Sequence, residues 1–82
     1  MDLRIDYSSN IQGQEDLAIK VADLSHELGR TCMLMPMLAE NEGDYPTMEM
    51  FIDGDYAFGS DFDIQASLSD GTIEQILKST NE

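Results

Sequence analysis

The sequence contains very little positive charge. Four Lys and Arg residues stand against 17 Asp and Glu residues in a chain of 82, so the formal net charge is −13. Proteins that bind nucleic acid need clustered Lys and Arg side chains to displace the counterions of the phosphates, so direct nucleic-acid binding is excluded. An anionic membrane surface is disfavoured as a partner for the same electrostatic reason.

Cysteine and long apolar segments are also scarce. Cys32 is the only cysteine, so the chain forms no internal disulfide, and this indicates a reducing setting. No run of about 18 apolar residues is present that would span a bilayer. The first four residues, MDLR, lack the basic-then-apolar order of a signal peptide. We therefore expect a cytoplasmic protein.

What the sequence does contain is enough apolar material for a core. Hydrophobic residues make up 41% of the chain, more than an acidic disordered tail would carry. A chain of this length has room for one domain, so residues 1–82 are expected to fold as one unit. All the basic residues lie outside residues 31–77, which hold ten acids. Such a field of one sign either attracts a basic partner or is simply a solvated surface.

Hydrophobic periodicity in the first half predicts a strand, a helix and a second strand. Residues 3–7 alternate between apolar and charged side chains, as in a half-buried strand. Residues 14–28 carry an apolar stripe at helical spacing, and Gly29 is the expected stop. Residues 31–38, TCMLMPML, are apolar on both faces, which predicts a central strand covered on two sides and ended by Pro36.

The second half predicts a hairpin and a closing helix. Residues 47–52 and 55–58 are strand candidates, and the Asp53-Gly54 pair between them is a strong hairpin signal. Ser69 is a suitable N-cap for a last helix that carries Ile73 and Leu77 on one face. The predicted order is β-α-β-β-β-α, with an α/β (α+β) fold and a four-stranded mixed sheet.

The tail resembles a known family. Residues 51–61, FIDGDYAFGSD, resemble the glutaredoxin pattern F-I-D-G-x-x-x-G-G-[CS]-D, and residues 63–66 and 71–77 continue it. Residues 45–47, YPT, resemble the cis-proline segment of the wider thioredoxin fold. The resemblance implies a thioredoxin-like fold from which the family's second helix is missing. The shortened order is also similar to that of selenoprotein W-like proteins.

The resemblance does not extend to the redox motif. Glutaredoxins carry C-x-x-C or C-x-x-S after the first strand, whereas residues 8–13 read SSNIQG. Thiol–disulfide exchange needs a thiolate, so we expect no redox enzyme and no cofactor. Pro46, Ser60 and Asp61 match the family's glutathione-binding positions. However, residues 31–77 offer no basic side chain for the carboxylates of glutathione.

Other site chemistry is weaker. The acids of residues 53–63 do not follow calcium-loop spacing, because Ala57 stands at the third ligand position, so no metal is expected. His26 is expected on the surface, and Cys32 as a buried, inert thiol. The methionines of residues 33–50 are expected in the core, or in part on an adaptable contact surface.

The leading functional hypothesis is a non-enzymatic acidic interaction protein on a redox-dead glutaredoxin-like scaffold. Its negative face would occupy the basic surface of a nucleic-acid-binding protein, as a DNA mimic does, in the manner of phage or mobile-element inhibitors. The acids expected to carry the interaction are Glu40, Glu42, Asp44, Asp53, Asp55, Asp61 and Asp63. One alternative is a redox adaptor that binds glutathione or a thiol protein around Pro46, Ser60 and Asp61. Another is an acidic subunit of a larger assembly.

Overall fold

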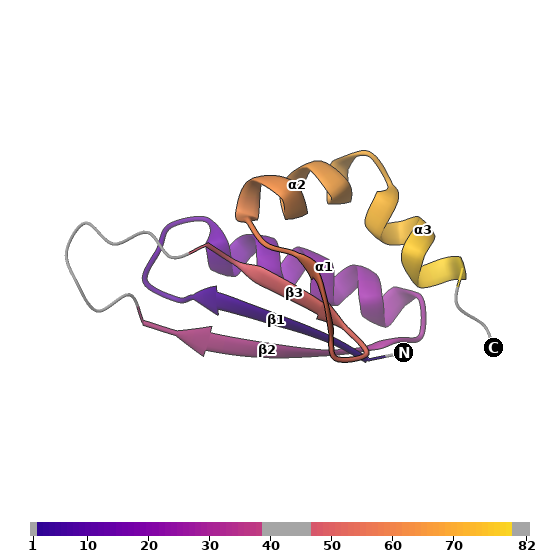
Figure 1. Ribbon diagram of the computed structural model, residues 1–82, viewed down its shortest axis with the longest axis horizontal. Helices are drawn as coiled ribbons and strands as arrows, with labels where there is room; N and C mark the ends of the chain where they lie inside the picture. Colours follow the sequence, from indigo (N-terminus) through magenta and orange to yellow (C-terminus); the bar gives the residue numbers. More distant parts are fainter. Residues whose placement is uncertain (1, 39–46, 80–82) are drawn as a thin grey trace.

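The computed structural model describes residues 2–38 and 47–79, which form an α+β fold with a mixed sheet and three helices (Figure 1). The elements in chain order are β1 (Asp2–Ser8), α1 (Gln14–Glu27), β2 (Thr31–Met37), β3 (Glu49–Ile52), β4 (Asp55–Phe58), α2 (Asp61–Ser69) and α3 (Thr72–Ser79). The four strands are ordered β2-β1-β3-β4. β1 and β2 run parallel, and the other two neighbouring pairs are antiparallel.

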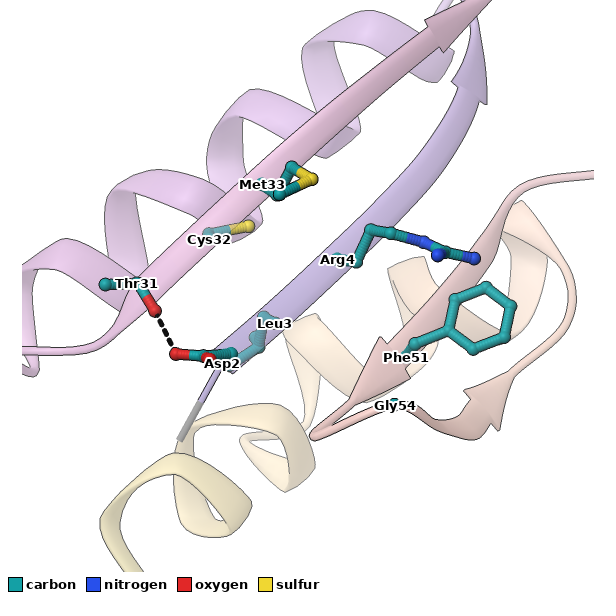
Figure 2. A pocket seen from close by; sticks show the side chains of 8 residues that line it. All are labelled: Asp2, Leu3, Arg4, Thr31, Cys32, Met33, Phe51 and Gly54. Atoms are coloured by element: carbon teal, nitrogen blue, oxygen red, sulfur yellow. Dashed lines mark hydrogen bonds between the residues drawn. The ribbon is translucent and has the colours of Figure 1, made fainter.

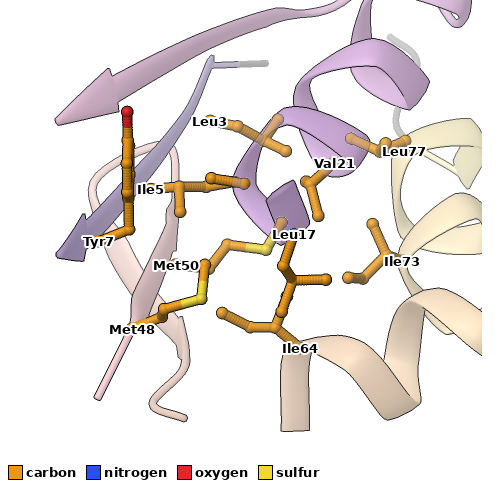
Figure 3. Packing of buried hydrophobic residues seen from close by; sticks show 11 residues of the cluster. Leu3, Ile5, Tyr7, Leu17, Val21, Met48, Met50, Ile64, Ile73 and Leu77 are labelled. Atoms are coloured by element: carbon orange, nitrogen blue, oxygen red, sulfur yellow. The ribbon is translucent and has the colours of Figure 1, made fainter. Parts of the chain in front are cut away.

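The core lies between one face of the sheet and the helices (Figures 1 and 3). Alternation along β1 buries Leu3, Ile5 and Tyr7, which confirms the predicted half-buried strand. On α1 the predicted stripe buries Leu17 and Val21 against them. The later elements complete the core with Met48, Met50, Ile64, Ile73 and Leu77.

The hairpin between β3 and β4 turns at Asp53-Gly54, as predicted. Both residues have positive φ, 51° for Asp53 and 86° for Gly54. This geometry matches the twist of the flanking strands, and Asp and Gly tolerate it better than other residues. The Asp53 N–H donates to the Asp2 carbonyl at 2.8 Å, which ties the turn to the start of β1.

The prediction of a central strand over residues 31–38 is wrong. β2 is an edge strand whose described neighbour is β1, and the interior strands are β1 and β3. Pro36 does not end the strand but lies inside it, opposite Tyr7. An edge strand accepts proline because one row of its backbone groups has no partner strand. The outward face carries Met33, Met35 and Met37, which are 59%, 42% and 47% exposed.

The predicted closing helix is present as α3, which buries Ile73 and Leu77, but the predicted order is incomplete because α2 lies between the hairpin and α3. Helix α2 is capped by Ser60, whose Oγ accepts from the Asp63 N–H at 3.0 Å. Ser69 ends α2 rather than capping α3. The chain then turns at Gly71, where φ is 87°, and the Asp70 carboxylate accepts from the Thr72 N–H at 2.9 Å. Hydrogen bonding from the side chain and then the backbone of Thr72 lowers the pKa of Asp70.

The sequence predicts that the second helix of the glutaredoxin pattern is absent from the connection between β2 and β3. Most of that connection, residues 39–46, lies outside the described residues. No helix of residues 2–38 or 47–79 combines the length and apolar character needed to cross a bilayer.

Buried and outward-facing methionines should differ sharply in their contribution to the stability of the fold. Met50→Ala removes a fully buried side chain and should lower the free energy of unfolding by about 2–5 kcal/mol. Met33→Ala changes an outward side chain and should alter it by no more than about 0.5 kcal/mol. Urea denaturation followed by circular dichroism measures both. Equal losses in the two variants would contradict the assignment of the faces.

Candidate functional site

The first group of predicted site residues lies at the hairpin turn. Asp53 and Asp55 are both exposed there. The Asp53 carboxylate is held toward the first strand, because its Oδ1 accepts from the Asp2 N–H at 2.8 Å. Asp2 is itself exposed, so three carboxylates gather at this end of the sheet.

The second group lies at the start of α2, where Asp61 is half-buried and Asp63 is exposed. Carboxylates in the first turn of a helix are stabilised by the partial positive charge of its unpaired N–H groups. A shallow hollow of about 390 Å³ separates this turn from the start of α1. It is lined by Gln12, Gly13, Leu17, Asp61, Phe62 and Gln65, none of which is basic.

The structure does not bring the two groups together. The four residues of β4 separate the hairpin turn from the entry to α2, a strand length of about 13 Å. Among residues 2–38 and 47–79, no three His, Cys, Asp or Glu side chains are grouped so that they could hold a metal ion. The remaining predicted site residues, Glu40, Glu42 and Asp44, lie outside the described residues.

The fold engages most of the chain's few cations in internal contacts. Arg4 forms an ion pair with Asp6 at 3.1 Å, and Lys78 forms one with Glu74 at 2.7 Å. Arg30 donates from Nη2 to the Leu77 carbonyl at 2.9 Å and joins the connection between α1 and β2 to α3. Three of the four Lys and Arg residues therefore have intramolecular partners, while the acids greatly outnumber them.

The predicted glutathione positions are only partly described. Pro46 lies outside the described residues, and the Ser60 hydroxyl caps α2. Ser9 lies in the turn that would hold the redox motif, and its hydroxyl donates to the Met37 carbonyl at 3.2 Å. Cys32 is half-buried on β2, and its burial raises the pKa of the thiol. His26 is exposed, as predicted.

Sequence reasoning missed the outward face of the sheet. The register places Arg4 opposite Met33 on β2 and opposite Phe51 on β3. Phe51 in turn lies opposite Tyr56 on β4. Two signals pointed to this face: the charged positions that alternate with the buried ones in β1, and a proline inside an apolar run, which is typical of an edge strand.

Neither a scan against protein-family models nor searches of curated proteins and of solved structures finds a match to this chain.

The environment of Cys32 generates a prediction about thiol reactivity. The raised pKa keeps the thiol protonated at neutral pH, and only the thiolate reacts readily. Native protein should therefore be labelled by a thiol reagent more slowly than protein unfolded in urea, on the order of tenfold. Because the folded state favours the protonated thiol, the free energy of unfolding should fall as the pH rises above the pKa that the thiol has in the unfolded chain. Equal labelling rates in the two states would show that burial does not suppress the reactivity of this thiol.

Proposed function

We propose that this chain is a non-enzymatic acidic interaction protein that occupies the basic surface of a nucleic-acid-binding protein. The observation that carries the proposal is the uncompensated charge. The chain has 17 acids and four basic residues, and three of those basic residues make contacts within the molecule. A field of this strength destabilises the folded state through self-repulsion, so a role in attracting a partner gives a reason for it.

A glutaredoxin-like scaffold without its thiols is consistent with the fold. The four-stranded mixed sheet and the succession β-α-β-β-β agree with what the resemblance implies. The resembling residues follow one another along the chain: residues 51–58 belong to the hairpin, Ser60 and Asp61 lie at the entry to α2, and residues 72–77 lie in α3. Ser8 at the end of β1 and Ser9 in the following turn stand in the region where the family has a cysteine, so the scaffold supplies shape rather than thiol chemistry.

The mechanism of such a protein is electrostatic occupation. Exposed carboxylates at Asp53, Asp55 and Asp63 can meet Lys and Arg side chains that would otherwise contact DNA phosphates. Long-range attraction raises the association rate, and carboxylates in the groove exclude the nucleic acid. An inhibitor of this kind suits a phage or mobile element acting against host defence or transcription.

Affinity capture from a lysate at low and high salt tests this function. The captured proteins should be basic and nucleic-acid-binding, and duplex DNA should compete for them.

The double variant Asp53→Asn with Asp55→Asn should slow association with a captured partner, on the order of tenfold at low salt, because it removes two steering charges. Stopped-flow or surface-based kinetics measure the rate, and its dependence on salt should become less steep.

The matched control removes the same charge elsewhere. Asp23→Asn with Glu27→Gln neutralises two exposed acids on the outside of α1 and should leave the rate closer to that of the unchanged protein. Partners that are neutral or acidic, or binding that does not change with salt, would overturn the proposal.

The redox-adaptor alternative has a separate test. If a glutathione groove persisted around Ser60 and Asp61, titration calorimetry at low salt would detect binding at millimolar ligand. We expect no heat beyond dilution, because the hollow beside Asp61 has no basic lining residue and glutathione is anionic. A saturable heat that disappears in the Asp61→Ala variant would favour the adaptor.

A further inference from the structure

The helices leave one face of the sheet uncovered by any other described element (Figure 1). The core side chains of α1, α2 and α3 all pack against the opposite face, through Leu3, Ile5 and Met50 of the sheet (Figure 3). We call the uncovered side the open face. On it lie Asp2, Arg4 and Asp6 of β1, Thr31, Met33, Met35 and Met37 of β2, Glu49 and Phe51 of β3, and Tyr56 of β4.

A row of four side chains crosses the middle of the open face. In strand order the row runs Met33, Arg4, Phe51, Tyr56. The Arg4 guanidinium lies 4.3 Å from the centroid of the Phe51 ring, and that ring meets Tyr56 edge to face at 5.9 Å. The Arg4 guanidinium also forms the ion pair with Asp6. The row therefore offers a surface with apolar and aromatic character.

The edge strand adds an apolar surface that carries no charge. Residues 31–38, TCMLMPML, have no ionisable side chain apart from the Cys32 thiol, in a chain of net charge −13. Exposed edge strands are often protected by charged side chains or by proline, and this one has Pro36 but no charged side chain. Met33 and Met35 point outward, and flexible thioethers adapt to the shape of a bound partner.

Acidic side chains of β1 and β3 flank the row of Met33, Arg4, Phe51 and Tyr56. Asp6 lies directly opposite Glu49, a like-charge pair on neighbouring strands that is destabilising by itself. Asp2 lies at one end of a hollow of about 500 Å³, which Arg4, Met33 and Phe51 also line (Figure 2). Since Asp6 offsets the charge of Arg4, the remaining charge of the open face is negative.

We propose that the open face binds a lysine- or arginine-rich segment of the partner that also carries large apolar side chains. An apolar side chain of that segment enters the hollow beside Met33 and Phe51, and its cations meet Asp2 and Glu49, the acids of this face that Arg4 does not neutralise. A second copy of this chain is a poorer occupant, because it would place acids against acids. The inference rests on the proposed function and adds to it an apolar contact that charge alone does not supply.

Two synthetic peptides of equal charge test the inference: a short lysine-rich peptide with leucine at two positions, and its counterpart with serine at both. The leucine peptide should bind about tenfold more tightly at low salt, since apolar burial is added to the same charge. The Met33→Ser variant should remove most of this advantage while leaving the serine peptide unaffected. Methionine methyl signals in NMR spectra should shift at Met33 and Met35 and not at the buried Met48.

The matched control is Ile19→Ser, which removes an apolar side chain that is 43% exposed on α1. It should leave the affinity for both peptides unchanged. Equal binding of the two peptides, or no effect of Met33→Ser, overturns the open-face inference while leaving the proposed function standing. Failure of both peptides to bind at low salt overturns both proposals. Reversible dimerisation that Met33→Ser abolishes would identify a second copy as the occupant instead.

Discussion

Burial of a single sheet face is the constraint on which the rest of the structure depends. β1 occupies the interior of the sheet, and its Leu3 and Ile5 side chains are 2% and 0% exposed beneath the helices. A strand alternates its side chains between two faces, so the inward direction of these residues sends Asp2, Arg4 and Asp6 outward. The same alternation fixes the outward direction of Phe51 once Met50 is buried. Core formation thus determines the composition of the open face.

The charge is compatible with this core because the described acids lie at its periphery. None of the described Asp or Glu side chains is fully buried, and helix starts and turns hold several of them. In these positions the unpaired backbone N–H groups and the high dielectric constant of the solvent reduce the free-energy cost of ionising the carboxyl groups. The self-repulsion that remains is opposed by a compact apolar cluster with contributions from every helix. A strongly acidic surface and a stable small fold are therefore not in conflict.

Local chemistry explains which features could be predicted from the sequence. The Asp53-Gly54 turn was predictable because positive φ restricts residue choice within two positions. The α1 stripe was predictable because helical burial repeats along one segment. The position of β2 was not, because an apolar run fits both a covered central strand and an edge strand. Of these two positions, Pro36 favours the edge strand. The break between α2 and α3 depends on Gly71, whose positive φ interrupts an otherwise helical stretch.

The negative charge of the candidate site could be predicted from the sequence, but the arrangement of its acids in space could not. Acid positions can be read from the sequence, whereas their division between the hairpin turn and the start of α2 depends on strand pairing. The open face needed the register as well, since Met33, Arg4 and Phe51 are distant in sequence and adjacent in the sheet. Charge attracts many basic proteins without distinguishing among them, and it acts mainly on association rate. Discrimination requires a contact that only some partners can fill, so apolar side chains among the acids are the features best suited to select one.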